Sequence, residues 1–453
     1  MSKSIKFYLA LYVSKMACVA LKVLKRNATH YPGWVALKIC PDFLGQVDKP
    51  EQLIGVMGTN GKTTVSNMIN DVLDQYDYVC LNNRLGSNIR EGVATSLLKA
   101  CSLTGKMKYR WGVLEIDERS SRLILPHIKP DYIVVTNIFR DSIKRNAHTD
   151  FIFDILTKSI PDTTTLILNS DDPLSNQLKP NNERFFYGIS PLPHEQNKEN
   201  NIIKDVMLCP HCGEKLSYSF HRYHHLGHVY CTKCGYKNPK PDYLITNVNY
   251  EESKFTALIK DKEYDFHMIS DNLVNIYNQL STISVLNNFG ISIEELQKAF
   301  NNMEITKSRA STFSDGDSNV MTVMSKGQNA VACSRVFDYV HFTEGKKQVI
   351  IMLDDNDDAK NSSENLNWVY DADFELLNDD NIERIIVGGK RCFDYKVRLM
   401  LAGVPEDKII TSIDENSTID YIVKDNSKVF ILHDIWKYQQ CQNLAKELVE
   451  RLK

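Results

Sequence analysis

The chain has 453 residues, which is too long for one ordinary domain and fits two or three. Hydrophobic residues make up 43% and charged residues 25%, a globular balance that excludes a disordered or fibrous chain. Lysine plus arginine (54) nearly balances aspartate plus glutamate (57), and the net charge of −3 argues against a basic nucleic-acid coat protein. Eleven cysteines in a long chain without a secretion signal indicate thiols or metal ligands, not a disulfide framework.

The first predicted element is a helix over residues 7–24, which are mostly apolar but interrupted by Lys15 and Lys22. Together with Arg26, these residues are spaced seven and four apart and share one helical face. The segment holds no uninterrupted apolar span long enough to cross a bilayer, and no small-residue cleavage site follows it. It is either an amphipathic helix packed on the protein body or a basic helix that also contacts an anionic membrane surface. We therefore expect a cytoplasmic protein, at the inner face of the cell membrane under the second interpretation.

Residues 50–190 alternate short apolar strands with helical stretches, which predicts a parallel α/β sheet. The expected strands are residues 53–57, 78–81, 112–116, 132–136 and 165–169. A polar loop, a cysteine-rich island and a further segment with strands and a helix follow, at residues 191–205, 209–234 and 242–303, with residues 278–288 in the helix. A second α/β pattern starts after residue 314, with strands at residues 349–353, 385–387 and 429–432.

A phosphate-binding loop is predicted where the strand 53–57 runs into glycines and then into a helical pattern at residues 65–73. The loop consists of Gly58, Thr59, Asn60, Gly61, Lys62, Thr63 and Thr64. Glycines let backbone N–H groups close around phosphate oxygens, and the helix N-terminus adds the positive end of its dipole. Lys62 can bridge the β- and γ-phosphates, and the Thr63 hydroxyl can hold magnesium. A strict Walker A motif would have glycine at Val56, so the match is to a shorter G-T-N-G-K-T-T form.

Carboxylates follow two of the neighbouring predicted strands. Strand 112–116 leads into an acidic trio, Glu115, Asp117 and Glu118. A second magnesium ligand is expected at the C-terminal end of a parallel strand beside the loop, and we assign it to Glu115. The alternative is that the trio forms a solvated loop. Asp141, which follows strand 132–136, is a further candidate for a magnesium or substrate contact.

The cysteine island has the spacing of a metal site. Its candidate ligands are Cys209, Cys212, Cys231 and Cys234, two C-x2-C pairs separated by eighteen residues. Gly213 and Gly235 follow the pairs and allow tight turns that aim the sulfurs inward. Four thiolates suit tetrahedral Zn²⁺ and leave no open position, so the pattern predicts a structural zinc ribbon over about residues 205–240. We interpret the neighbouring histidines as surface or packing residues, and we expect no nucleic-acid binding.

The loop at residues 58–64, Glu115 and the pair Asn275 and Asn278 together resemble the Mur ligase family. The ribbon inserted after residues 168–173 and the run at residues 368–375 narrow the resemblance to its MurT branch, the subunits of lipid II isoglutaminyl synthase. The resemblance runs over nearly the whole chain. It implies an N-terminal helix and lead-in (residues 1–48), a Mur ligase central-type ATP-binding domain (49–313) and a C-terminal Rossmann-like α/β domain (314–453).

In function, the resemblance implies an ATP-dependent amide ligase subunit. Such chains phosphorylate the α-carboxylate of D-glutamate in the lipid II stem peptide, and ammonia from a GatD-type glutaminase partner then yields D-isoglutamine. Carried over by motif, Lys62 and Thr63 match phosphate and magnesium contacts, and Glu115 a magnesium ligand. Asn275 and Asn278 match residues near the adenine. Arg309 resembles an arginine that reaches the phosphates, or else is a surface arginine at a hinge.

Several positions depart from the family pattern. Lys144 and His148 replace acidic residues that follow Asp141 in the family. Asn365 stands where the family has an aspartate thought to complete the partner's glutaminase site, and an asparagine could not stabilise an imidazolium in the same way. Glu364 could substitute if the backbone shifts by one residue.

Three hypotheses therefore stand beside one another. The first is a MurT-type amide ligase subunit, and the second is a paralogue that activates another carboxylate or uses free ammonia. The third is a non-catalytic regulatory subunit that binds nucleotide. The intact Lys62, Thr63 and Glu115 argue against the third, whereas Asn365 and His148 keep it open.

Overall fold

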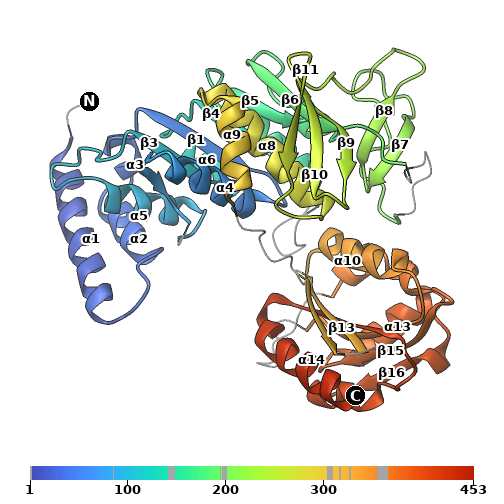
Figure 1. Ribbon diagram of the computed structural model, residues 1–453. Coiled ribbons are helices and arrows are strands. Elements are labelled where there is room, and N and C mark those ends of the chain that lie inside the picture. The colour runs from blue at the N-terminus through green and yellow to red at the C-terminus, as the bar shows by residue number, and fades with distance from the viewer. Residues whose placement is uncertain are drawn as a thin grey trace. The chain divides into compact units, whose positions relative to one another are not determined.

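The computed structural model describes residues 3–84, 86–140, 148–193, 195, 201–303, 310–315, 318–325, 328–354 and 366–452. The chain divides into two compact units (Figure 1). The first comprises residues 1–139, 149–199 and 205–306, and the second comprises residues 140–148, 200–204 and 307–453. The domain boundaries expected at residues 48/49 and 313/314 stay predictions.

The first unit is built on a nine-stranded sheet in the order β11-β10-β9-β6-β5-β4-β1-β3-β2. Its strands are β1 (Gln52–Met57), β2 (Cys80–Asn82), β3 (Trp111–Glu115), β4 (Tyr132–Val135), β5 (Thr165–Asn169), β6 (Arg184–Ile189), β9 (Tyr243–Asn249), β10 (Lys254–Ile259) and β11 (Lys262–His267). Strands β1 to β6 pair in parallel, which confirms the predicted α/β class. β9, β10 and β11 extend the sheet as an antiparallel meander.

One predicted strand is displaced. Residues 78–81 were expected to pair, but β2 begins only at Cys80. Asp77 has a positive φ of 59° and Tyr78 donates its backbone N–H to Leu73, so both residues belong to the turn that leaves α4 (Lys62–Gln75). Val79 is exposed for the same reason.

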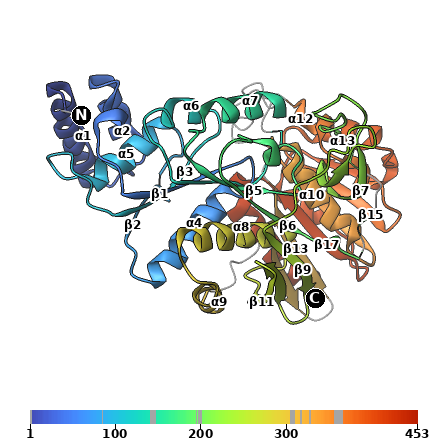
Figure 2. The same ribbon diagram turned by 90° about the horizontal axis from the view of Figure 1, so that it is seen from above.

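Helices cover both faces of this sheet (Figure 2). One face carries α4, α8 (Leu273–Phe289) and α9 (Ile293–Asn301), and the other carries α1 (Ile5–Val23), α2 (Tyr31–Ile39), α3 (Phe43–Gln46), α5 (Arg90–Ala100), α6 (Ser121–Ile124) and α7 (Thr149–Ser159). The strand alternation explains this sandwich, because successive side chains point to opposite faces. Along β1, Ile54 and Val56 pack into the first core, whereas Leu53 and Met57 pack into the second. A buried strand of this kind reads as a continuous apolar run.

The N-terminal helix α1 packs on the protein body, as one interpretation of the sequence expected. Ser4 caps it by accepting the Phe7 N–H, and Phe7, Ala10, Leu11 and Ser14 are buried. Of the three basic residues expected on one face of the helix, Lys22 is exposed on α1 and Arg26 lies beyond its end at Val23. Lys15 does not join such a face, because its Nζ turns inward and donates to the Leu98 and Cys101 carbonyls at the end of α5. In the described part of the chain, no helix has the length and hydropathy to cross a membrane.

The second unit contains a six-stranded sheet in the order β12-β13-β17-β14-β15-β16. Its strands are β12 (Ala310–Asp315), β13 (Ser318–Met324), β14 (Lys347–Met352), β15 (Ile382–Gly388), β16 (Ile409–Ser412) and β17 (Lys428–His433). All neighbours are parallel except the pair of β12 and β13. The three strands predicted here lie within or overlap β14, β15 and β17, which confirms a second α/β fold.

Helices also cover the two faces of this second sheet. α10 (Ala330–Phe342), α12 (Trp368–Asp371) and α13 (Cys392–Leu401) pack with Val349 and Ile351 of β14. On the other face, α14 (Tyr438–Leu452) packs with Ile350 and Met352. Short 3-10 turns complete the described elements: η2 (Ser175–Gln177) in the first unit, and η3 (Phe374–Leu377), η4 (Glu406–Lys408), η5 (Asn416–Tyr421) and η6 (Ile435–Lys437) in the second.

Candidate functional site

The predicted phosphate loop connects β1 to α4, and two glycines determine its shape. Gly58 (φ 119°) and Gly61 (φ 91°) both have left-handed backbone conformations. A Cβ atom on Gly58 would lie 2.2 Å from Thr136 Oγ1, and one on Gly61 would lie 2.3 Å from Asn278 Oδ1. Conformation and close contact therefore both require glycine at these positions. Gly61 is the N-cap of α4, so Lys62, Thr63 and Thr64 form its first turn, three residues before the helical pattern predicted at residues 65–73.

The segment that follows β4, residues 136–139, forms hydrogen bonds with the phosphate loop. Asn137 accepts the Thr59 N–H at its carbonyl and the Asn60 N–H at its Oδ1, each at 2.9 Å. Thr136 Oγ1 donates to the Asn60 carbonyl at 2.7 Å, and the Phe139 N–H donates to Thr59 Oγ1 at 2.9 Å. Sequence reasoning missed Thr136, Asn137 and Phe139. Their position at the end of a strand next to β1 was the available signal, since adjacent parallel strands end at one edge.

Lys62 is held by a carboxylate that the sequence analysis did not select. Its Nζ lies 2.8 Å from Glu118 Oε1 and also donates to the Gly58 carbonyl. Burial opposes the charge, but Glu118, with Glu115 and Asp117 further away, outweighs burial and raises the pKa of Lys62. The side chain therefore stays an ammonium at neutral pH. Glu118 and Asp117 are 5% and 8% exposed, so the alternative of a solvated acidic loop is wrong.

Glu115 lies at the end of β3, in register with Val56 of β1 just before the loop. Its Oε1 accepts a hydrogen bond from Asn88 Nδ2 at 2.8 Å, and its backbone N–H donates to Asn83 Oδ1. Thr63 is exposed at the first turn of α4. This is the arrangement expected of a carboxylate beside a phosphate loop, and the magnesium role of both residues stays a prediction.

Asn275 and Asn278 lie on α8, whose first turns reach the loop at Gly61. Asn278 is buried and donates to Asn275 Oδ1 at 3.3 Å, while Asn275 donates to Ser270 Oγ at 3.1 Å. The fold thus brings both asparagines to the loop from more than 200 residues away in sequence. Their expected role near the adenine stays a prediction. The other candidates lie outside the described residues, namely Asp141, Lys144, Arg309, Glu364 and Asn365.

The four predicted ligands, Cys209, Cys212, Cys231 and Cys234, converge as the spacing predicted. Their sulfur atoms all lie within 4.8 Å of one another, and the pairs Cys209–Cys234 and Cys212–Cys231 are 3.5 and 3.6 Å apart. A tetrahedron with metal–sulfur bonds of about 2.3 Å has edges of about 3.8 Å, so the cluster could hold a metal ion. Gly213 and Gly235 take positive φ values of 69° and 76° and donate to the carbonyls of Cys209 and Cys231. These are the tight turns expected after each cysteine pair.

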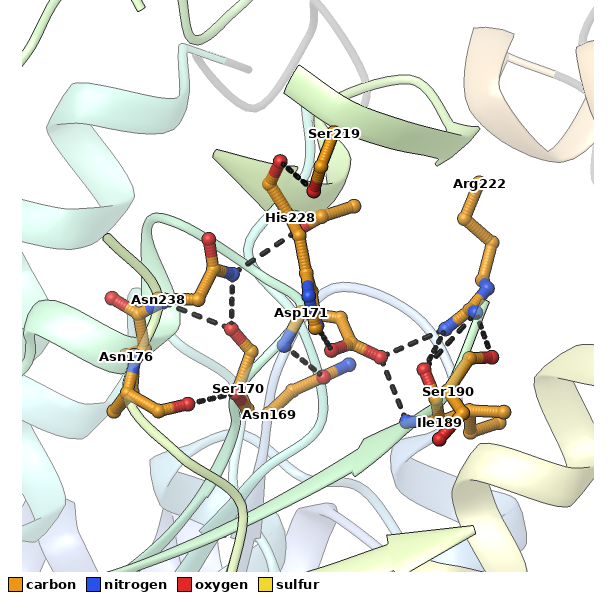
Figure 3. Close-up of polar contacts among 12 residues, drawn as sticks. Asn169, Ser170, Asp171, Asn176, Ile189, Ser190, Ser219, Arg222, His228 and Asn238 are labelled. Carbon is orange, nitrogen blue, oxygen red and sulfur yellow. Dashed lines mark hydrogen bonds and ion pairs between the residues drawn. The ribbon is translucent and has the colours of Figure 1, made fainter. Parts of the chain in front are cut away.

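The hairpin of this ribbon, β7 (Ser217–Tyr223) and β8 (Leu226–Tyr230), is attached to the first unit by a buried ionic network (Figure 3). Arg222 Nη1 lies 2.8 Å from Asp171 Oδ2, and both side chains are fully buried. Arg222 also pairs with Glu195 at 2.6 Å and donates to the Ile189 and Ser190 carbonyls. His228 Nε2 contacts the other Asp171 oxygen at 3.0 Å. Each nitrogen of the guanidinium therefore has at least one hydrogen-bond acceptor.

This network keeps Asp171 ionised. Burial opposes ionisation, yet the His228 hydrogen bond and the Arg222 charge outweigh burial and hold the pKa of Asp171 below its ordinary value. Tyr277 of α8 donates its hydroxyl to the same carboxylate and accepts from Arg222. A buried charge pair with its remaining partners satisfied is the case in which removing one member is costly.

A second set of contacts links the β7–β8 hairpin to residues 138–139, which follow β4 beside the phosphate loop. His225 Nε2 lies 3.3 Å from Asp172 Oδ1, while the other oxygen of Asp172 accepts the Ile138 N–H at 2.8 Å. The His225 ring also packs on Phe139, at 4.6 Å between ring centroids. His225 and His228 thus make packing and polar contacts, and the metal-type group found among the described residues consists of the four cysteines.

Comparisons with known proteins show which families and folds this chain matches. Residues 56–223 match the model of the Mur ligase middle domain, and residues 327–435 match that of the MurT ligase C-terminal domain. A pseudomurein peptide ligase type C from Methanothermus fervidus shares the fold, with a TM-score of 0.66 over 91% of this chain and 81% of that chain at 17% identity. The fold and the loop therefore define a Mur ligase-type protein.

Two relatives show to which family of Mur ligase-type proteins the chain belongs. Each is the MurT subunit of a glutamine-hydrolyzing lipid II isoglutaminyl synthase. The one from Staphylococcus aureus (strain COL) is 30% identical over 87% of this chain and 88% of the relative, and the one from Streptococcus pneumoniae (strain ATCC BAA-255 / R6) is 31% identical over 93% and 92%. The chain belongs to the MurT family.

Proposed function

We propose that this chain is an ATP-dependent amide ligase subunit that activates the α-carboxylate of D-glutamate in the lipid II stem peptide. Ammonia from a separate GatD-type glutaminase subunit converts the activated group to D-isoglutamine. The observation that carries this proposal is the partly buried, charged Lys62 in a glycine loop at the start of α4, in a chain of the MurT family. The MurT relatives, which are named as subunits of the synthase, support the substrate and the partner.

The chemistry explains why a phosphate loop serves an amide ligase. A carboxylate is a poor electrophile, and ATP supplies the phosphoryl group that gives it a leaving group. The carboxylate oxygen displaces ADP at the γ-phosphorus, ammonia adds to the acyl carbon, and phosphate leaves as the amide forms. The chain contributes positioning and charge neutralisation rather than a covalent intermediate. The backbone N–H groups at the N-terminus of α4 would bind the phosphates, and Thr63 and Glu115 would hold Mg²⁺.

Lys62 and Glu118 together prepare this site. In the structure the Lys62 ammonium is bonded to Glu118 and to the Gly58 carbonyl, so it is already charged and directed toward the loop. Bound phosphates would compete with Glu118 for the same ammonium. We infer that Glu118 keeps Lys62 protonated and oriented before nucleotide binds.

We also propose that the ribbon holds one structural Zn²⁺ ion. Purified protein is expected to contain about one zinc ion per chain by elemental mass spectrometry, because four thiolates form a closed tetrahedral site. Cys231→Ser should lose this metal and unfold at a lower temperature, since metal binding contributes folding free energy. Cys18→Ser is the matched control, because Cys18 is a partly buried thiol of α1 outside the ribbon. Full zinc content in Cys231→Ser would contradict the assignment.

The substrate would place the reaction at the inner face of the cell membrane, and α1 is the segment through which we propose a peripheral membrane contact.

Asn365 is the position at which coupling to the glutaminase is tested, because the family aspartate there is thought to complete the partner's site. Glu364 is the candidate substitute for the aspartate.

The deciding experiment is reconstitution of this chain with its glutaminase partner. Amidation of lipid II is measured with ATP and either glutamine or ammonium as the nitrogen source, and we expect activity with both. Activity with ammonium alone would show that the glutaminase is uncoupled and that Asn365 does not replace the aspartate. ATP binding without amidation from either source would overturn the proposal and favour a regulatory subunit.

A further inference from the structure

Helix α1 exposes a continuous apolar stripe on the side away from the protein body. The large side chains of this stripe are between 46% and 89% exposed, and they recur at alternating spacings of four and three residues. They are Ile5, Leu9, Tyr12, Met16, Val19 and Val23. The opposite face of the same helix is buried against α2, α3 and α5 through Phe7, Ala10 and Leu11. One helix thus carries two apolar faces, and packing accounts for only one of them.

The neighbouring helix adds exposed aromatic surface. α1 and α2 lie side by side at one end of the first unit (Figure 1), and Tyr31 and Trp34 of α2 are 54% and 42% exposed. Their rings stack at 5.8 Å, and Lys38 Nζ lies 5.5 Å from the Trp34 ring. Exposed tyrosine and tryptophan with adjacent lysine is the composition of protein surfaces at a membrane–water interface.

The N-terminal segment that contains α1 and α2 carries positive charge only. The first 41 residues contain seven lysines and arginines and no aspartate or glutamate, although the whole chain has a formal charge of −3. Lys15 is used internally, and Lys3 pairs with Asp48, but the remaining five are exposed: Lys6, Lys22, Lys25, Arg26 and Lys38. Basic side chains beside an apolar stripe complement an anionic lipid surface. Two copies of the same basic segment would repel each other, which disfavours a helix pair between copies of this chain.

We propose that α1 lies flat in the interface of an anionic membrane, with the stripe inserted among the acyl chains and the flanking lysines and Arg26 at the headgroups. The helix is about 28 Å long at 1.5 Å per residue, and it runs along the membrane plane rather than across it. This deepens the proposed function by bringing the chain to a lipid-linked substrate. It rests on the surface of α1 and not on the amidation reaction.

The experiment measures flotation of the full-length chain with vesicles of phosphatidylglycerol and phosphatidylcholine, or of phosphatidylcholine alone. We expect binding to the anionic vesicles that weakens with salt, because both apolar insertion and charge contribute. The variant Met16→Glu/Val19→Glu should bind at least about tenfold more weakly. The matched control is Val79→Glu/Leu103→Glu, because these residues are equally exposed (65% and 62%) but lie outside the stripe.

Three outcomes would overturn the proposal. The first is that the wild-type chain does not float, and the second is that both double variants float equally well. The third is a concentration-dependent dimer that the stripe variant abolishes, which would make the stripe an interface between two copies of the chain. Amidation of a soluble, short-chain analogue of the substrate separates this proposal from the proposed function. We expect the stripe variant to retain that activity, whereas loss of the reaction itself would appear with the soluble analogue as well.

Discussion

Replacing Lys62 with alanine is expected to lower kcat for ATP-dependent amidation by about 10³-fold or more. In the proposed function the Lys62 ammonium binds the phosphates, and Glu118 raises the pKa of Lys62 so that it stays positive. Without this ammonium, the negative charge that develops during phosphoryl transfer would lose a positive side-chain partner. The measurement is a steady-state amidation assay with saturating ATP, in which Lys158→Ala serves as the control because Lys158 is an exposed lysine of α7.

The single variant also leaves Glu118 buried without its partner, so a loss of folding could imitate a loss of catalysis. The double variant Lys62→Ala/Glu118→Gln removes the unpaired carboxylate and should recover the thermal stability while remaining inactive. Glu118→Gln alone keeps a hydrogen-bond acceptor for Lys62 and should retain measurable activity. Turnover at the wild-type rate in a folded Lys62→Ala protein would refute the phosphate assignment.

Replacing Arg222 with methionine is expected to lower the free energy of unfolding of the first unit by about 3–5 kcal/mol. The change keeps much of the side-chain volume but leaves the ionised Asp171 without its guanidinium partner and removes the pair with Glu195. Urea unfolding at neutral pH measures the loss. Arg110→Met is the control, because Arg110 is 66% exposed and its pair with Glu51 lies at the surface, where such pairs contribute at most about 1 kcal/mol. Equal unfolding midpoints for Arg222→Met and wild type would show that the network does not stabilise the unit.

The network also predicts a pH dependence with a defined sign. The pKa of Asp171 is held below its ordinary value, so its ionised form stabilises the folded state. That contribution is complete above the unfolded-state pKa of about 3.9 and is lost as the pH falls through the lower folded-state pKa. The free-energy difference between wild type and Asp171→Asn should therefore shrink as the pH falls below about 4. A difference that stays constant with pH would contradict this origin.

Features written in short stretches of sequence were predicted correctly. The strand, loop and helix around Gly61 and the cysteine spacing from Cys209 to Cys234 each lie within a few tens of residues, so local spacing and turn chemistry determine them. The structure shows the glycines in left-handed conformations and the four sulfurs together. The second α/β fold also followed from its apolar runs, since a buried parallel strand needs no partner to be recognised.

Features that depend on contacts between distant segments were not predicted. Glu118 was passed over for Glu115 because the sequence does not show which carboxylate of the trio turns toward Lys62, 56 residues earlier. The pair of Asp171 and Arg222 joins the end of β5 to a hairpin 51 residues later, and no local sequence pattern indicates this pairing.

The N-terminal helix separates the two kinds of information most clearly. Periodicity alone predicted a helix over residues 7–24 that is rich in apolar residues and interrupted by lysines, and the observed helix α1 runs from Ile5 to Val23. Only the tertiary structure decided that Phe7 and Leu11 are buried, that Lys15 bonds to the end of α5 and that Met16 and Val19 remain outside. The physical reason is that helical spacing specifies which residues share a face, whereas burial of a face depends on the segment that packs against it.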